Sequence, residues 1–419
     1  MPMPVRSLPV LQNWDCKGCT DCCREYRVQV TEEEKARIEA QGWGADPAMN
    51  GVRLFNWDGG WFEGRYRLNH SIDGACVFLD SKGGCRIHAK FGSEAKPLAC
   101  RVYPFVFVPF GHEWRIGLRY ACPESTHDRG RPIAAHHAEL LDYANRLEKQ
   151  EQVGERMQAA PLLQRARSVP WADLDRFLQA FRGYIRDERR PLEWRLRKCL
   201  AVINLCRAAS FDAITGKRMD EFLEVVGEGV NPDVPARPEA VAPPGWVSRM
   251  LFRQTLAIYA RKDTGRDRGI SKQGRLALLR AAWRFANGSG RVPAVHGLIP
   301  ETTFEEIEAR SMPLSEASQS LLVRYYQVKI DSGQFFGPNN FRRFFWDGLE
   351  TLMLTYPAIR WLGRALHDRN PEDALALAVR IVDNNFGFNP LLGSRRQLMG
   401  TRILARRGGI ARLIAWYSR

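Results

Sequence analysis

Cysteines are concentrated at one end of this chain of 419 residues. Eight of the ten lie between Cys16 and Cys122, whereas Cys199 and Cys206 stand apart in the remainder. The first four occupy the stretch DCKGCTDCCR, with the spacing C-x2-C-x2-C-C. A chain of this length can bury a large hydrophobic core without disulfide cross-links, so the need for stability does not by itself explain the cysteines. The sequence therefore divides into a cysteine-rich head and a cysteine-poor body.

The head contains short elements typical of a small irregular α+β unit. The run Thr31–Glu34 has the pattern of a capping box and predicts a short helix that ends at Gly42. Short apolar runs predict strands in RYRLNH, ACVFLD and CRIHAKF. The runs RVYPFVFVPF and EWRIGLRYAC predict a hairpin that turns near Gly111 and leads to Cys122. The cysteines are expected on turns and strand ends.

The body has the apolar spacing of helices from about Pro132 onward. Helices are predicted in PIAAHHAELLDYANRLEKQ, PWADLDRFLQAFRGYIRDE and PLEWRLRKCLAVINLCRAA, then at 246–262, 273–287, 303–328, 340–367 and 371–384, with a last one near the C-terminus. We expect a mainly α fold, in which a small irregular cysteine-rich α+β metal-binding head is followed by a large all-helical body. The predicted divisions are a cysteine-cluster domain at 1–130, a helical region at 131–230, a proline-rich linker at 231–245 and a C-terminal helical region at 246–419.

The cysteine spacing points to metal chemistry. Two cysteines separated by two residues can direct both sulfurs to one point, as in zinc and iron-sulfur sites. The candidate ligands are Cys16, Cys19, Cys22, Cys23, Cys76, Cys85, Cys100 and Cys122. Eight thiols can fill two four-coordinate zinc sites, or hold an iron-sulfur cluster, expected as 4Fe-4S, with some left over. Neighbouring side chains tend to point apart, so Cys22 and Cys23 leave open whether one centre or two is built.

The surroundings of the cysteines bear on this choice. The N-terminus lacks the apolar core of a secretory signal, and no apolar run is long enough to predict a membrane span. We therefore expect a reducing cytoplasm, where standing disulfides are rare. Arg24, Arg86 and Arg101 each follow a cysteine directly. They are expected either to compensate thiolate charge or simply to reflect an arginine-rich composition.

Net charge does not identify a partner. The formal charge of +15 is scattered, and no helix-turn-helix, RNP or basic-zipper pattern accompanies it. A solvated basic surface is expected, without specific nucleic-acid binding.

Two features of the body have structural explanations. Cys199 and Cys206 lie seven residues apart and are expected in a helical core. The segment 331–341 combines a flexible turn with aromatic residues, and is expected either to border a pocket or to connect two helices.

Four ordered motifs carry a family resemblance. They are C-x2-C-x2-C-C, C76-V-F-L79, C85-R-I-H88 and K96-P-L-A-C100-R-V-Y-P-F105. Together they resemble the signature of the YkgJ-type cysteine-cluster proteins, which are described as zinc- or iron-chelating. The resemblance covers the head and implies a chelated metal there. The gap between Cys85 and Cys100 is longer than in the simpler pattern, and His88 stands where an aromatic residue is common, either as an extra ligand or as an exposed loop residue.

A looser resemblance extends into the body. The motif C122-P-E, the run RRPLEWRLRKCLAVINLC and the stretch from LLVRYYQVKI to RRFFWDGLETLMLTYPAIRWLG are similar to flagellin lysine N-methylases. This resemblance implies a protein lysine N-methyltransferase that uses S-adenosylmethionine on a flagellin-like substrate. The nearest glycine-rich pattern, Leu223–Gly229, instead predicts a helix end. Two further functions stay open: a metalloprotein whose body recognises a protein partner, and a thiol-based redox sensor.

Overall fold

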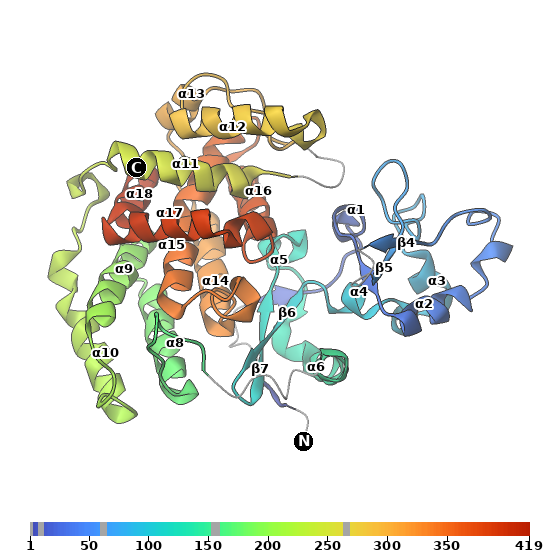
Figure 1. Ribbon diagram of the computed structural model, residues 1–419, viewed down its shortest axis with the longest axis horizontal. Coiled ribbons are helices and arrows are strands. Elements are labelled where there is room, and N and C mark those ends of the chain that lie inside the picture. Colours follow the sequence, from blue (N-terminus) through green and yellow to red (C-terminus); the bar gives the residue numbers. More distant parts are fainter. Residues whose placement is uncertain (1–2, 7–11, 59–64, 152–159, 263–268) are drawn as a thin grey trace.

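The computed structural model describes residues 3–6, 12–58, 65–151, 160–262 and 269–419 (Figure 1). Small sheets and short helices occupy the N-terminal part, and longer helices make up the rest. The predicted fold class, a small α+β head followed by a helical body, is confirmed. Within the described residues, no helix combines the length and the apolar composition needed to cross a bilayer.

A three-stranded antiparallel sheet organises the head. Strand β5 (Arg65–Leu68) lies between β3 (Gln29–Val30) and β4 (Phe55–Asp58). The short helices around it are α1 (Asp21–Glu25), α2 (Glu32–Glu39), α3 (Arg86–Phe91) and α4 (Leu98–Val102). Their apolar side chains form a core of their own, called here the small core, which comprises Val30, Ile38, Trp43, Met49, Phe55, Leu68, Phe78 and Ile87.

The capping box of α2 also positions a cysteine-bearing helix. The Thr31 side chain accepts a hydrogen bond from the Glu34 N–H, and the Glu34 carboxylate accepts one from the Thr31 N–H, as predicted. The other oxygen of Glu34 accepts a hydrogen bond of 2.7 Å from the N–H of Leu98. Because Leu98 begins α4, this buried bond fixes the helix that carries Cys100.

The strands predicted in ACVFLD and CRIHAKF are wrong. These runs form only single β-bridges, His70 with Cys76 and Leu79 with Cys85, and CRIHAKF continues as α3. The reason is local: the Asp80 carboxylate accepts hydrogen bonds from the N–H groups of Lys82 and Gly84, which closes a tight turn. Too few residues remain on either side for a strand, and the cysteines sit where the turns begin and end.

The predicted hairpin is present and joins the head to the body. Strands β6 (Phe105–Phe110) and β7 (Glu113–Leu118) pair antiparallel, and β1 (Val5–Arg6) adds to β7 in parallel. Gly111 supplies the positive φ, 60°, that the turn requires. The apolar side chains of the hairpin belong to the second hydrophobic cluster, called here the large core, which they share with the helices of the body. A further strand pair, β2 (Asn13–Trp14) with β8 (Arg131–Pro132), lies beside it.

Helices form the body around one buried helix. They are α5 (Pro123–His127), α6 (His137–Glu151), α8 (Trp171–Arg186), α9 (Leu192–Ala208), α10 (Lys217–Gly229), α11 (Trp246–Ala260), α12 (Arg275–Asn287), α13 (Phe304–Ala309), α14 (Glu316–Ser332), α15 (Phe345–Ala365), α16 (Pro371–Asn385), α17 (Arg395–Arg406) and α18 (Gly409–Ser418). Every residue of α15 is buried. It runs through the middle of the body and is surrounded by the other helices (Figure 1).

Two helix predictions need correction. The single helix expected at 303–328 is two helices, α13 and α14, because Pro313 cannot continue a helix and Ser315 caps the next one. The single helix expected near the C-terminus is also two, α17 and α18, separated at Gly408, which has a φ of 63°. The Leu223–Gly229 pattern lies inside α10, as expected for a helix end.

The proline-rich segment 231–245 is held against the body. The Trp194 indole N–H donates to the carbonyl of Val234, and the Arg197 guanidinium donates to the carbonyl of Pro235. Both donors belong to α9, so this segment runs along that helix. The division of the chain at 130, 230 and 245 remains a proposal. Because side chains of the hairpin, which precedes residue 130, pack in the same core as the body helices, limited proteolysis is a suitable test of the first boundary.

Candidate metal centre

All eight candidate cysteines lie in described residues and are free thiols. Cys16 and Cys19 are exposed on the segment before α1, and Cys22 and Cys23 lie within α1. The remaining four occupy separate turns and short helices: Cys76 and Cys85 at the β-bridges, Cys100 in α4 and Cys122 as the residue before α5. The fold thus collects thiols from five places in the sequence.

Four of these thiols form a group, called here the inner group: Cys23, Cys76, Cys85 and Cys100. The N–H of Cys76 donates a hydrogen bond of 2.8 Å to the carbonyl of Cys23, which joins two of the segments. The side chains of Cys76, Cys85 and Cys100 all pack against the small core. The pKa of Cys76 is raised to about 12, mainly by burial and to a smaller extent by the neighbouring Cys23 and Cys85, while a hydrogen bond with the Phe78 backbone opposes the rise.

Cys100 interacts electrostatically with the other members of the inner group. Its pKa is raised first by burial and then by the nearby thiols of Cys76, Cys23 and Cys85. Each of the other three members therefore lies near enough to Cys100 for charge on one sulfur to affect the other. A cation at this place would reverse the effect, because it stabilises the thiolates that burial disfavours.

Three more thiols form what is called here the outer group: Cys16, Cys19 and Cys122. Desolvation raises the pKa of Cys19 to about 11, and the Cys122 and Cys16 thiols add smaller contributions in the same direction. Cys122 is only 5% exposed and belongs to the large core, whereas Cys16 and Cys19 are exposed.

Cys22 stands between the two groups. Its Sγ lies 4.0 Å from that of Cys23, so these neighbouring side chains do not point to opposite sides. The hydrogen bond between them lowers the pKa of Cys23 and raises that of Cys22. Cys22 also interacts electrostatically with Cys100 of the inner group and Cys16 of the outer group. In a tetrahedral zinc-thiolate site with bonds of about 2.3 Å, neighbouring sulfurs are about 3.8 Å apart, so a separation of 4.0 Å also fits two ligands of one ion.

The sulfurs are near one another without being gathered to coordination distance. Among the described residues, no three of His, Cys, Asp and Glu lie in an arrangement that could hold an ion as it stands. Metal binding would therefore draw the thiols of each group together, and their position on turns and short helices allows such movement. His88 is exposed on α3.

Positive charge reaches the thiols from one arginine and one lysine. After the hydrogen bond from Cys22, the charges of Lys96 and Arg24 lower the pKa of Cys23. Lys96 also opposes the rise in the pKa of Cys100 that burial causes. Lys96 was not singled out as a source of charge in the sequence, although its place four residues before Cys100 in K96-P-L-A-C100 is a signal for it.

Arg101 and Arg86 have other partners. The Arg101 guanidinium lies 2.5 Å from Glu94 and 3.3 Å from Asp142, so two carboxylates neutralise it. Arg86 interacts electrostatically with Asp80. Arg24 also contacts a carboxylate, that of Asp73 at 3.5 Å, but its charge still lowers the pKa of Cys23.

Comparison with known proteins identifies the cysteine-bearing segment. Residues 15–126 match the family model CxxCxxCC, described as "Putative zinc- or iron-chelating domain". Residues 15–126 are therefore similar to this family, and the segment is called the CxxCxxCC domain below after the model that it matches. The match confirms the first resemblance and supports metal binding by the domain; none of the comparisons supports the resemblance to flagellin lysine N-methylases.

One curated relative has a short match. Uncharacterized protein MJ0939 from Methanocaldococcus jannaschii is 28% identical over 94 residues, which cover 22% of this chain and 29% of that protein. The matched part thus spans less than a third of the relative's length. No solved structure matches the chain.

The CxxCxxCC domain is fastened to the body through its cysteine-bearing helix. Asp21 at the start of α1 pairs with Arg380 of α16, and Glu25 at its end pairs with Lys262 at 2.7 Å. The Tyr26 hydroxyl, directly after α1, donates a hydrogen bond of 3.0 Å to Asn384 of α16. These contacts join the helix that carries Cys22 and Cys23 to α16 and to the segment of Lys262.

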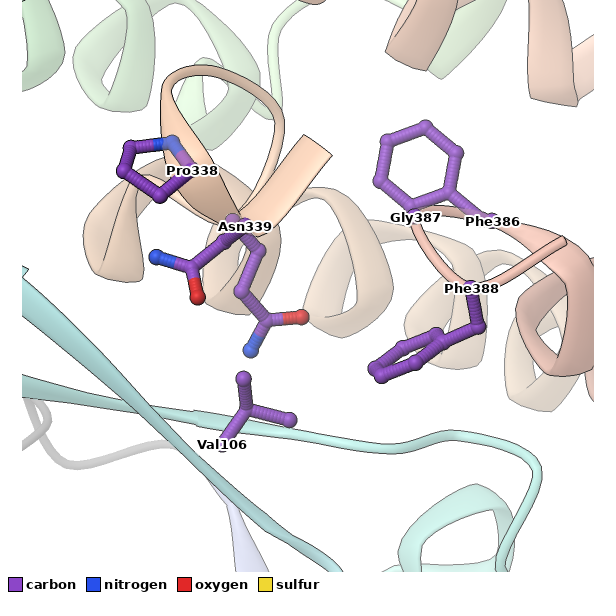
Figure 2. Close-up of a pocket in the computed structure, with 7 residues that line it drawn as sticks. Val106, Pro338, Asn339, Phe386, Gly387 and Phe388 are labelled. Atoms are coloured by element: carbon purple, nitrogen blue, oxygen red, sulfur yellow. The ribbon is translucent and has the colours of Figure 1, made fainter. Parts of the chain in front are cut away.

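A cavity of about 230 Å³ lies in the body near this junction (Figure 2). It is lined by Val106, Gln334, Pro338, Asn339, Phe386, Gly387 and Phe388. The expectation that segment 331–341 borders a pocket is confirmed. The Arg119 guanidinium lies 3.5 Å from the ring centre of Phe388, which lines the cavity. Arg119 also donates a hydrogen bond to Asn384 of α16, the helix that contacts α1.

Proposed function

We propose that the CxxCxxCC domain holds metal at two centres, each formed by four thiols. The inner group, Cys23, Cys76, Cys85 and Cys100, forms the first centre. The outer group forms the second, with Cys22 as its fourth ligand. The observation that carries the proposal is that Cys76, Cys85 and Cys100, from three separate segments, all pack against the small core, while Cys23 is joined to Cys76 by a backbone hydrogen bond of 2.8 Å.

The donor set fits zinc or an iron-sulfur cluster. Four thiolates are a common ligand set for both, and Lys96 and Arg24 offset part of the negative charge of the inner group. Zinc would supply folding free energy, whereas a 4Fe-4S cluster would in addition carry an electron. The residues of the domain hold the ligands on turns, and α1 ties them to the body.

The body is proposed to recognise a protein partner in a reducing, cytoplasmic setting. It has a large buried core, and its link to α1 lets the state of the metal centres influence α16. A thiol-based redox sensor is the second candidate. It is favoured by the hydrogen-bonded pair of Cys22 and Cys23, in which one thiol has a lowered pKa, because a thiolate is the form that oxidants attack.

Metal analysis of anaerobically purified protein tests the proposal. Two zinc ions per chain, or iron with sulfide and a visible absorption band, is the expected result. Replacement of Cys100 by Ser should remove the metal of the inner centre and leave that of the outer centre. Replacement of Cys206 by Ser is the matched control, because Cys206 is buried in α9 and has no role in either centre. A folded wild-type protein with neither zinc nor iron would contradict the proposal.

A further inference from the structure

Helix α12 carries apolar side chains on its outer face. Leu276, Leu279 and Trp283 are 73%, 66% and 66% exposed. They follow one another at spacings of three and four residues, so they form a single stripe about 10 Å long on one side of the helix. Large exposed apolar side chains gathered in this way mark a surface that something else covers.

The stripe cannot be buried by rotation of the helix, because the opposite face is already in use. Ala281 and Phe285 of α12 are buried in the large core. The ring of Phe285 packs 5.3 Å from that of Phe304 in α13 and 6.2 Å from that of Trp361 in α15. Helix α12 lies at the outer edge of the body, beside α11 and α13 (Figure 1).

Positive charge flanks the stripe. Arg275, Arg280 and Arg284 are exposed, and α12 contains no acidic residue. Among the described residues, none of these three arginines pairs with a carboxylate. The acidic side chains of α13 are engaged elsewhere: Glu305 accepts from the N–H of Gly290, Glu306 caps its own helix, and Glu308 accepts from Trp416 and Tyr417. The outer face of α12 is therefore both apolar and cationic.

We propose that α12 docks on an anionic lipid bilayer surface, with Leu276, Leu279 and Trp283 inserted among the lipid head groups. Leucine and tryptophan on one face with arginine beside them is the pattern of helices that lie in the membrane interface. The formal charge of +15 on the whole chain adds long-range attraction to an anionic surface.

Two other occupants fit less well. A second copy of this chain would bring arginines against arginines. An acidic groove of another protein would bury three side chains of one helix, well short of the about 800 Å² that each partner of a stable complex buries. Shallow insertion into a bilayer needs no such area, because the attraction of many charges adds to that of a few apolar groups.

Flotation with lipid vesicles tests the proposal on the full chain. The wild type should bind vesicles that contain phosphatidylglycerol, should bind vesicles of phosphatidylcholine alone at least about tenfold more weakly, and should lose binding at high salt. The double variant L279E/W283E should bind at least about tenfold more weakly. The matched control is Val225→Glu, since Val225 is 70% exposed on α10 and lies outside the stripe.

Circular dichroism shows whether the variants keep the fold, and R280Q provides a second probe that leaves the apolar stripe unchanged. Failure of the wild type to bind either vesicle at low salt overturns the proposal. The proposal is also overturned if the wild type does not bind vesicles but forms a concentration-dependent dimer that the L279E/W283E variant does not form. In that case a second copy of the chain covers the stripe. Equal binding by the wild type and a folded L279E/W283E variant overturns the assignment to α12.

Discussion

The ammonium of Lys329 lies 2.6 Å from the carboxylate of Asp383, and both side chains are fully buried. Lys329 belongs to α14 and Asp383 to α16, so the pair joins two helices of the body. Lys329 also donates to the carbonyl of Leu118 at the end of the hairpin, and Asp383 accepts from the N–H of Ala121. One buried pair therefore holds two helices and the chain that leads to Cys122.

Replacement of Lys329 by Met should destabilise the protein by about 3–5 kcal/mol, because it leaves a buried carboxylate without its main partner. Arg119 lies 3.9 Å from the same carboxylate and offsets part of the loss. The measurement is the free energy of unfolding from urea titration followed by circular dichroism.

The same substitution at Lys35 provides the control. Lys35 pairs with Glu39 on α2, where solvent screens the interaction, so Lys35→Met should destabilise the protein much less than Lys329→Met. If Lys329→Met and Lys35→Met had equal effects, the pair in the body would not be a buried ion pair in solution.

The sequence predicts those parts of the fold that depend on near neighbours. The capping box at Thr31 and the hairpin turn at Gly111 are local patterns, and both are present. The break between α13 and α14 was missed, although Pro313 signals it, because the apolar spacing continues across the break.

The candidate site was predictable in its residue types and not in its arrangement. The C-x2-C-x2-C-C spacing indicates metal ligands, and the family match agrees. That Cys122 belongs to the large core, while Cys100 packs on the small one, depends on how distant segments meet. Contacts such as Glu25 with Lys262 join residues that are far apart in the sequence, and no local pattern records them.

The two adjacent cysteines should differ in which centre they serve. Cys23→Ser should remove metal from the inner centre, because Cys23 lies with Cys76 and Cys100, whereas Cys22→Ser should remove it from the outer centre. Metal content per chain should fall by half in each variant. Native mass spectrometry counts the bound ions, and spectra of the cobalt-substituted variants show which centre remains.

The double variant C22S/C23S supplies the limiting case and should lose both centres. If Cys22→Ser and Cys23→Ser lost the same ion, with the other retained, both cysteines would be ligands of one centre. The separation of 4.0 Å between their sulfurs allows that outcome, so the experiment decides between the two assignments.

The stability of the body should depend on pH through Glu350. Burial raises the pKa of this carboxyl to about 7, although Arg207 lies 2.5 Å away and opposes the rise. A folded pKa above the usual 4.5 means that the folded state binds the proton more tightly. The contribution to stability is therefore full below about pH 4.5 and is lost as the pH rises through about 7.

Glu350→Gln should flatten this dependence by up to about 3 kcal/mol between about pH 5 and about pH 8, because the amide does not titrate. Urea unfolding at several pH values provides the measurement. Glu224→Gln, at an exposed position of α10, should leave the dependence unchanged. An unchanged pH profile in the Glu350 variant would show that other groups govern it.

Removal of metal should loosen α16 as well as the CxxCxxCC domain. Helix α1 carries Cys22 and Cys23 and is joined to the body by Asp21 with Arg380 and Glu25 with Lys262. A chelator should therefore speed hydrogen exchange in α1 and also in the part of α16 near Arg380, as measured by mass spectrometry. In the variant D21N/E25Q, which keeps every cysteine, the faster exchange should stay within the domain. If exchange in α16 of the wild type did not change on metal removal, α1 would not transmit the state of the metal centres to the body.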